Sequence, residues 1–304
     1  MTAFRISAPA SSANLGSGFD AVGIALDLRM TAEVEELAPG ATSAWIYSGP
    51  HAPTHDGLRG CVERGIVRIA PNAPPLRVLL DNAIPLGAGL GSSAAGHALG
   101  VAIGARLLDR MPEDDVLALA VADLEGHPDN ALAAWYGGVV VAAHGEDGLT
   151  VGRFAAPPVQ VVVAVPQLTL ATAAARALLP ESYSRADAVY NVQRAALLGA
   201  ALASGRVDLL GAAMLDRLHQ PYRAAALPGM TEALALRDPD LVGIALSGAG
   251  PSVLAFVRGD AVRIGARLAA CFGGAATVLL PAADAHGVLV HEHRAGAAVR
   301  ELAQ

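Results

Sequence analysis

The chain contains the stretch Ile84-Pro85-Leu86-Gly87-Ala88-Gly89-Leu90-Gly91-Ser92-Ser93-Ala94-Ala95, in which every second residue from 87 to 91 is glycine. Glycine adopts positive φ readily and, because it lacks a Cβ, lets a ligand come close to the backbone. The two serines begin an apolar segment that predicts a helix over residues 92–109. The unpaired N–H groups of that helix and the positive end of its dipole would face the glycines. The stretch therefore predicts a phosphate-binding loop at residues 85–95.

Two common nucleotide-binding patterns do not fit this glycine loop. The Walker loop needs a lysine before its Ser or Thr, and the dinucleotide fingerprint spaces its glycines differently. The chain has no lysine at all, so its basic side chains are all arginine. A nucleotide at the loop would be held by backbone N–H groups and a metal ion, which leaves arginine for a carboxylate or for the transferred phosphoryl group. A plain loop capped by serine is the competing interpretation.

Length and composition exclude several classes of protein. With 304 residues, of which 53% are hydrophobic, the chain can fill the core of one large domain or of two ordinary ones. Its net charge of −7 and its scattered arginines give no basic stripe for a nucleic acid. It has no apolar run of about 18 residues and no apolar signal core near Met1, so we expect a cytoplasmic protein without a membrane span. Cys61 and Cys271 lack metal-ligand spacing and are interpreted as buried small hydrophobic residues.

Hydrophobic periodicity predicts a mixed order of strands and helices. In the first half, strands are expected over residues 4–8 (ended by Pro9), 21–37, 45–47, 76–81, 137–143 and 149–154, and helices over residues 56–70 (with Asp56 as N-cap), 92–109 and 111–125 (ended by Gly126). Pro157-Pro158 marks the expected boundary between a domain of residues 1–156 and a domain of residues 157–304. In the second half, strands are expected over residues 159–165, 241–246, 253–257, 276–280 and 288–291, the last two closing its sheet, and helices over residues 169–178, 186–204, 207–218, 228–236 and 260–272.

Polar side chains stand at places where a ligand could meet them. Asn14 and Asp20 lie at the two ends of a polar, glycine-containing turn, for which a plain structural role is the alternative. Thr172 and Arg176 are four residues apart, so a helix would put both on one face.

A second polar cluster follows the helix predicted to end at Gly126. Glu125, His127, Asp129 and Asn130 fall within six residues between apolar segments. The simple interpretation is a cap between two helices. The alternative is a corner for metal and substrate, because a carboxylate is a hard oxygen ligand that suits Mg²⁺.

Three motifs occur in order along the chain: Pro-Ala-Ser-Ser-Ala-Asn-Leu-Gly-Ser-Gly-Phe-Asp at residues 9–20, the glycine loop at residues 85–95, and Ser-Gly-Ala-Gly-Pro-Ser-Val at residues 247–253. This set resembles the motifs of the superfamily of galactokinase, homoserine kinase, mevalonate kinase and phosphomevalonate kinase, the GHMP kinases, and it covers essentially the whole chain. Residues 12–20 and the Glu-Gly-His-Pro-Asp-Asn sequence at 125–130 are most similar to the homoserine kinase family. Ser17 stands where that family often has proline, a difference that concerns the stiffness of a turn rather than substrate binding.

The resemblance implies an α+β fold of two domains. The N-terminal one would be an ATP-binding domain like domain 2 of ribosomal protein S5, the C-terminal one would be ferredoxin-like, and both sites would lie between them. The implied activity is that of an ATP:L-homoserine O-phosphotransferase, which makes O-phospho-L-homoserine on the route to threonine. ATP and Mg²⁺ are the implied cofactors and L-homoserine is the implied small-molecule partner. A homodimer is left open.

The resemblance also implies roles for single residues. Residues 85–95 would cradle the phosphates of ATP, with Gly248 and Gly250 closing over them from the other domain, and Mg²⁺ would lie between Ser92 or Ser93 and Glu125. The homoserine would be held by Asn14, Asp20, Asn130, Arg176 and Arg223, and the residues expected to act on the reacting groups are Asn130, Arg176 and Thr172. Asp129 and His127 remain candidates for a base, which a loose transition state does not require.

Physical chemistry supports an amino acid as the substrate. Its ammonium needs a carboxylate, for which Asp20 is suited, and its carboxylate needs an arginine such as Arg176 or Arg223. The closest rival is another kinase of the superfamily with a mevalonate-pathway acid as substrate, against which Asp20 with Asn14 favours an ammonium group. A second rival is a non-catalytic sensor of a small molecule, but such a relative should have lost Glu125 or the serine pair.

Overall fold

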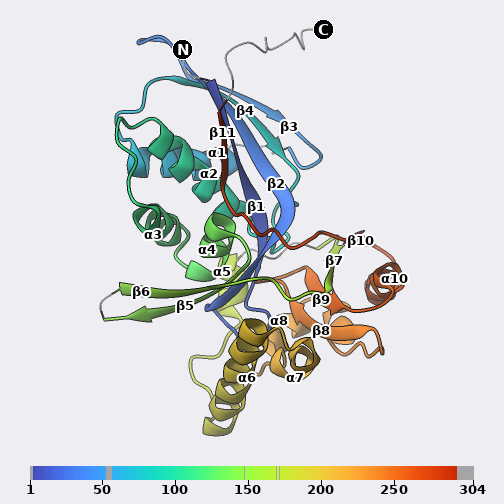
Figure 1. Ribbon diagram of the computed structural model, residues 1–304. Helices are drawn as coiled ribbons and strands as arrows, with labels where there is room; N and C mark the ends of the chain where they lie inside the picture. Colours follow the sequence, from blue (N-terminus) through green and yellow to red (C-terminus); the bar gives the residue numbers. More distant parts are fainter. Residues whose placement is uncertain (1–2, 53–56, 147, 169, 171, 293–304) are drawn as a thin grey trace.

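The computed structural model describes residues 3–52, 57–146, 148–168, 170 and 172–292. Two β-sheets, each packed against helices, meet near the middle of the molecule (Figure 1). The first sheet has the strand order β11-β1-β2-β4-β3, with β5 pairing with β2 and β6 with β5. Its strands are β1 (Ala3–Ala13), β2 (Val22–Glu36), β3 (Ala44–Ser48), β4 (Leu76–Asn82), β5 (Val139–Gly145), β6 (Gly148–Phe154) and β11 (Leu289–Glu292). The mixed α+β class is therefore as predicted.

Strand β1 is longer than the sequence predicts. Pro9 was expected to end it, because proline has no N–H to give to a strand ladder. Instead β1 continues to Ala13, and its pairing with β2 shifts register between Pro9 and Ala10. A bulge of this kind accommodates the missing donor. The extra length carries the chain to the junction of the two sheets, where Ala13 O accepts a hydrogen bond of 3.1 Å from Gly248 N.

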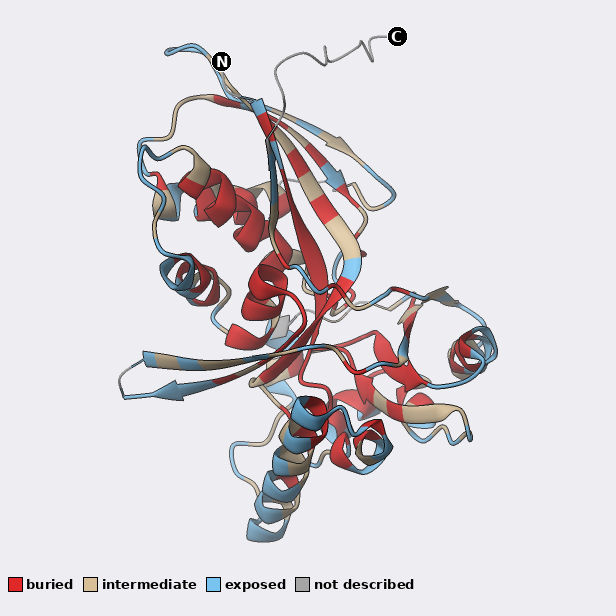
Figure 2. Ribbon diagram, viewed as in Figure 1, coloured by how far each residue is buried: buried red, intermediate tan, exposed pale blue. Residues whose placement is uncertain are grey.

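Four helices cover one face of the first sheet (Figure 1). They are α1 (Gly57–Ile69), α2 (Ser92–Arg106), α3 (Asp114–Glu125) and α4 (Pro128–Tyr136). Figure 2 shows α2 buried along most of its length, and it packs closely on α1, since a Cβ at Gly100 would lie 2.1 Å from Val62 O. Gly126 ends α3 with a φ of 80°, as predicted. Asp56, the predicted N-cap of α1, lies outside the described residues.

The second sheet is antiparallel, with the order β10-β7-β9-β8. Its strands are β7 (Gln160–Pro166), β8 (Leu241–Leu246), β9 (Val253–Val257) and β10 (Ala276–Leu279). The helices of this half are α5 (Thr172–Ala177), α6 (Arg185–Ser204), α7 (Leu210–Ala213), α8 (Gln220–Ala225), α9 (Met230–Leu234) and α10 (Ala261–Cys271). All four strands lie where the sequence predicts them, within one or two residues at each end.

The helix predicted over residues 207–218 is wrong. A 3₁₀ turn at Val207–Leu209 and the single turn of α7 take its place, and the chain then bends before α8. Asp216 causes the bend, because its carboxylate accepts hydrogen bonds from the backbone N–H groups of Leu218, His219 and Gln220 at 3.0, 2.9 and 2.7 Å. A short acidic side chain that bonds to nearby backbone competes with the helix in this way.

The sequence predicts that the strand now labelled β11 closes the second sheet. This prediction is wrong, because β11 returns to the first sheet. It pairs with the edge of β1, with Ile6 opposite Val290. The chain that leads to it is fixed to the first sheet by Asp284, which forms an ion pair with Arg29 and accepts hydrogen bonds from two backbone N–H groups. The prediction failed because alternation within a strand does not reveal which sheet the strand joins.

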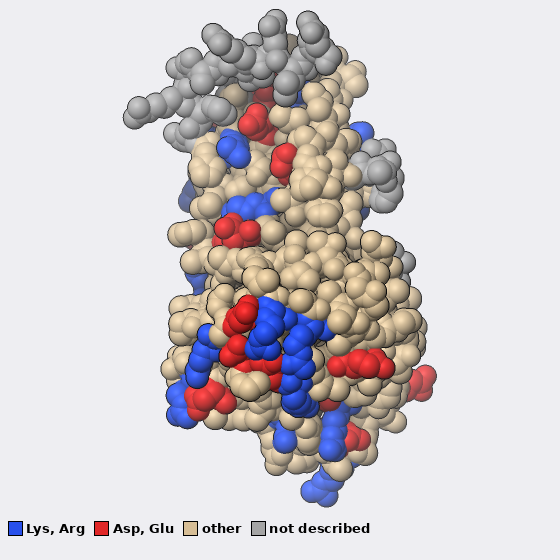
Figure 3. Space-filling model, turned by 90° about the vertical axis from the view of Figure 1, so that its right-hand side faces the viewer, with Lys and Arg blue, Asp and Glu red and all other residues tan. Residues whose placement is uncertain are grey.

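The surface gives no large area of one charge on the face seen in Figure 3. Acidic and basic side chains are mixed there, and on the second half Arg263 and Arg267 pair with Asp238. None of the described helices is both long enough and apolar enough to cross a bilayer. Cys61 is buried, as predicted, but the prediction for Cys271 is wrong. Cys271 is the last residue of α10 and is only partly covered.

Candidate active site

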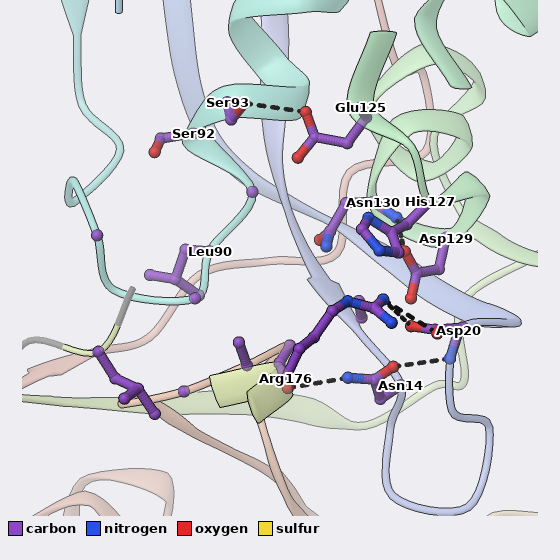
Figure 4. A pocket seen from close by; sticks show the side chains of 18 of the residues that line it. Asn14, Asp20, Leu90, Ser92, Ser93, Glu125, His127, Asp129, Asn130 and Arg176 are labelled. Atoms are coloured by element: carbon purple, nitrogen blue, oxygen red, sulfur yellow. Dashed lines mark hydrogen bonds and ion pairs between the residues drawn. The ribbon is translucent and has the colours of Figure 1, made fainter. Parts of the chain in front are cut away.

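A cavity of about 240 Å³ opens where the glycine loop, the turn after β1 and the loop between β8 and β9 come together (Figure 4). Both halves of the chain contribute to its wall. The side chains and backbone that line it belong to Ala13, Asn14, Asp20, Gly87, Gly89, Leu90, Gly91, Ser92, Ser93, Glu125, His127, Asp129, Asn130, Leu170, Arg176, Arg223, Gly248, Ala249 and Gly250. Residues from all three sequence motifs therefore meet in one place.

The glycine loop and the N-terminus of α2 form one end of the cavity. Gly87, Gly89 and Gly91 have positive φ angles of 64°, 74° and 66°. Helix α2 begins at Ser92, and no side chain in the described part of the chain caps its first turn. Its free N–H groups and the helix dipole are therefore available to an anion.

The loop of residues 247–252 docks onto the glycine loop. The Ser247 hydroxyl donates to Gly89 O at 2.7 Å, and Ala88 O accepts a hydrogen bond of 3.3 Å from Ser252 N. A Cβ on Gly89 would lie 2.4 Å from Ser247 O and 2.6 Å from Gly250 O. Contact between the two loops thus requires glycine at position 89. The docking also brings Gly248 and Gly250 to the cavity, from the half of the chain opposite the phosphate loop.

Ser93 and Glu125 meet beside the start of α2. The Ser93 hydroxyl donates to Glu125 Oε2 at 2.9 Å, while Figure 4 shows the other carboxylate oxygen pointing into the cavity. Hydroxyl and carboxylate oxygens are ligands that Mg²⁺ accepts, together with phosphate oxygens and water. Within the described ranges, no group of three or more His, Cys, Asp or Glu side chains is placed to hold a metal ion. The corner therefore suits a metal that shares its ligands with a bound phosphate.

Asp20 and Arg176 face each other at the other end of the cavity. Arg176 Nη2 lies 3.0 Å from both carboxylate oxygens of Asp20. Asn14 holds Asp20 in place, because Asn14 Oδ1 accepts from Asp20 N and Asn14 Nδ2 donates to Gly248 O, each at 2.9 Å. Asn14 and Asp20 have positive φ angles of 72° and 55°. This conformation costs a non-glycine residue about 1–2 kcal/mol, and such strain concentrates at functional sites.

Arg223 is a buried cation whose hydrogen-bond partners among the described residues are all neutral. It is 2% exposed, and its guanidinium contacts His219 Nδ1 and the carbonyl oxygens of Ala175 and Gly248, at 3.3, 3.4 and 3.2 Å. Burial lowers the pKa of Arg223. In the described part of the chain no carboxylate forms an ion pair with it, so the negative charges of Asp20 and Asp216 act on it only from a distance. Arg176 Nε is likewise buried without a partner there.

Polar residues at the N-terminus of α4 line the same cavity. Asn130 Oδ1 accepts a hydrogen bond of 2.9 Å from Ser11 Oγ, and its amide nitrogen has no hydrogen-bond partner among the described residues. Asp129 is 2% exposed. Burial is the main cause that raises its pKa to about 7, and the negative charges of Asp20 and Glu125 raise it further. The hydrogen bond from Asn130 N acts in the opposite direction. His127 is half-buried at the cavity wall. The cluster therefore lines the cavity, and its role in binding metal or substrate stays a prediction.

Some predicted site residues lie beside the cavity rather than in its wall. The lining does not include Pro85, Leu86, Ala88, Ala94 and Ala95, although they belong to the glycine loop and the first turn of α2. Thr172 is the first residue of α5, one turn before Arg176, and its side chain lies outside the described structure.

Two residues that pack behind the site, Phe19 and His219, are not predicted from the sequence. Phe19 lies against three cationic or polar groups: the His219 ring stacks on it at 4.8 Å, and the guanidinium carbons of Arg223 and Arg176 lie 5.3 and 6.0 Å from its centre. His219 Nε2 donates to Gly16 O at 2.8 Å, and burial lowers the pKa of His219. Phe19 stands next to Asp20 in the first motif, which could have indicated it. His219 is distant in sequence, so only the fold reveals it.

Comparison with known proteins identifies the family of this chain. Residues 59–138 match the model of the GHMP kinase N-terminal domain, and residues 198–274 match that of the GHMP kinase C-terminal domain. A homoserine kinase of Solibacter usitatus is 44% identical, covering 83% of this chain and 84% of its own, and one of Moorella thermoacetica is 38% identical, covering 93% and 98%. The crystal structure of homoserine kinase from Cytophaga hutchinsonii matches with a TM-score of 0.81 at 25% identity, covering 95% of this chain and 98% of that one. The fold is thus the two-domain GHMP kinase fold predicted from the motifs, and the chain belongs to the homoserine kinase family of the GHMP kinases.

Proposed function

We propose that this protein transfers the γ-phosphoryl group of ATP to the side-chain hydroxyl of L-homoserine. One observation carries the proposal: a single cavity has an uncapped helix N-terminus with two oxygen ligands at one end, and a carboxylate with two arginines at the other. The first end is complementary to a nucleotide phosphate with its metal. The second is complementary to a zwitterion, which is the form that an α-amino acid takes at neutral pH.

At the substrate end, the two arginines form a binding site for an anion. Arg223 is buried without a carboxylate partner among the described residues, so a substrate carboxylate would compensate its charge. The same carboxylate would engage Arg176, which then releases Asp20 to accept the ammonium group. Thr172, on the same short helix as Arg176, is proposed to contact the substrate as well. Asn14 contributes by fixing the orientation of Asp20.

At the nucleotide end, Mg²⁺ is proposed to bind Ser93 and Glu125, with Ser92 as the alternative serine. The donor set fits, since Ser93 and Glu125 offer hydroxyl and carboxylate oxygens beside a phosphate site. When bound, Mg²⁺ would neutralise charge that develops on the transferred phosphoryl group. Backbone N–H groups of the glycine loop would hold the other phosphate oxygens, and Gly248 and Gly250 would approach them from the second half.

Transfer requires the hydroxyl to lie in line with the γ-phosphorus and to lose its proton. Asn130 is placed to orient the hydroxyl through its free amide nitrogen. Asp129 is the better candidate for the proton acceptor, because it is buried in the cavity wall with a pKa of about 7, whereas His127 is only half-buried. Arg176 stabilises the transition state by holding the substrate. The free cysteines fit the cytoplasm as the proposed compartment.

The test is a coupled assay of ADP release with a panel of hydroxyl acceptors. We expect turnover with L-homoserine, and little with mevalonate or with a homoserine analogue that lacks the ammonium group. Detection of O-phospho-L-homoserine as the product would exclude simple ATP hydrolysis. A preference for the singly charged acid over the amino acid would contradict the proposal and favour the mevalonate-type alternative.

A further inference from the structure

His97 is buried directly behind the candidate metal corner. It belongs to α2, and its side chain is 3% exposed. Its Nδ1 lies 2.8 Å from Glu125 Oε2, and its Nε2 lies 3.0 Å from the guanidinium of Arg64 on α1. The ring therefore bridges an exposed arginine and the carboxylate that faces the cavity.

The hydrogen on Nδ1 is present in both charge states of the ring. Arg64 has only donors, so in the neutral ring Nε2 accepts from it and Nδ1 carries the hydrogen. Burial lowers the pKa of His97, but hydrogen bonds to Cys61 and Glu125 outweigh burial and raise it to about 9. The charged ring carries hydrogens on both nitrogens. In either case Nδ1 donates to Glu125, so the contact does not depend on pH near neutrality.

Glu125 Oε2 thus receives two hydrogen bonds, one from His97 Nδ1 and one from Ser93 Oγ at 2.9 Å. Both fall on the same oxygen, and the other points into the cavity (Figure 4). A glutamate side chain that is free to rotate would spread its charge over many positions. Two donors on one oxygen restrict the carboxylate to one orientation, with the second oxygen aimed at the metal position.

We propose that His97 is a positioning residue, which holds Glu125 in the orientation that binds the metal ion. The inference rests on the proposed function, because it takes Ser93 and Glu125 as the metal ligands. Outer partners that orient a metal ligand typically contribute ten- to a hundredfold to metal affinity. We therefore expect loss of the Nδ1 donor to weaken metal binding by on the order of tenfold or more.

Two substitutions of similar size and polarity separate the donor from the packing. The amide nitrogen of asparagine can take the place of Nδ1, whereas that of glutamine reaches toward the place of Nε2. The probe is Mn²⁺, whose affinity for the protein with ADP is measured by electron paramagnetic resonance, without any turnover. We expect His97→Asn to stay within about threefold of the unchanged protein and His97→Gln to bind Mn²⁺ about tenfold or more weakly. Val101→Ala, a buried change elsewhere on α2, is the control.

The outcomes distinguish this inference from the proposed function. Equal Mn²⁺ affinity of His97→Gln and the unchanged protein would overturn the positioning role, provided that circular dichroism shows both proteins to be folded. So would an equal loss in His97→Asn and His97→Gln, which would mean that the ring matters only for packing. Glu125→Gln is measured in parallel. If it leaves Mn²⁺ affinity unchanged, then the proposed metal site itself is wrong.

Discussion

Gly87 and Gly89 offer a direct test of how the phosphate loop is built. Both have positive φ, of 64° and 74°, and both line the cavity. A Cβ on Gly87 would have no neighbour within 4 Å, whereas one on Gly89 would meet Ser247 O at 2.4 Å and Gly250 O at 2.6 Å. Replacement of each by alanine therefore imposes the same backbone strain but a steric clash only at position 89.

The expected magnitudes follow from these two contributions. The left-handed conformation costs alanine about 1–2 kcal/mol, so Gly87→Ala should lower the free energy of unfolding by about that amount. Gly89→Ala adds an overpacking cost of about 1–3 kcal/mol or more, because backbone carbonyls cannot rotate away as a side chain would. Its total loss should be about 2–5 kcal/mol, which is a large share of the stability of a typical domain.

Urea unfolding of both variants, with and without ATP, measures these differences. We expect Gly87→Ala to unfold slightly earlier than the unchanged protein, and Gly89→Ala to unfold much earlier and to lose most of its stabilisation by ATP, since the loops at residues 85–95 and 247–252 no longer dock. Equal losses of stability in the two variants would refute the reasoning, because they would show that the contact with the second loop has no energetic weight.

Other changes test the two ends of the cavity. Glu125→Gln should lower kcat by on the order of a hundredfold at saturating Mg²⁺, while Asp123→Asn on the exposed side of the same helix should not; a normal rate for Glu125→Gln would place the metal elsewhere. Asp20→Asn should raise KM for homoserine by about thirtyfold, or about 2 kcal/mol, and leave KM for ATP nearly unchanged; equal changes in both would make Asp20 a turn residue only. Arg223→Lys should also raise KM for homoserine, because lysine cannot grip a carboxylate through two N–H groups, and an unchanged KM would argue against that contact. Asp129→Asn should be more stable than the unchanged protein at pH 8 but not at pH 4. Burial raises the pKa of Asp129 from 3.8 to about 7, so the unchanged protein loses up to about 4 kcal/mol of stability as the pH rises through that window. The variant does not lose this stability, because asparagine does not ionise. Urea denaturation of both proteins at pH 4 and pH 8 measures this difference, and the same change in the free energy of unfolding between the two pH values would contradict the prediction.

The sequence predicted most of the elements that form the cavity, because their signals are local. Glycines at alternate positions, a serine start for α2 and Gly126 at the end of α3 each act within a few residues. The resemblance of the motifs then placed Asn14 with Arg176 and Gly248 in one site, although they are far apart in the chain.

The rest depends on contacts that no local pattern contains. The sequence interprets Gly89 through the phosphate of a ligand, yet the position that its Cβ would take lies against the carbonyl oxygens of another loop. His97 looks like one residue of an apolar helix until the fold sets Glu125 beside it. Asp216 ends a helix that its apolar neighbours predict, because its carboxylate bonds to three backbone N–H groups.

The return of β11 to β1 has a consequence for how the protein is made. The strand that completes the edge of the first sheet is formed by residues 289–292, which leave the ribosome long after β1. During synthesis, the open edge of β1 therefore presents unpaired N–H and C=O groups to any neighbouring chain. A nascent protein stalled before residue 289 would carry an almost complete first sheet with the edge of β1 unpaired. We expect it to depend on chaperones more than the finished chain does.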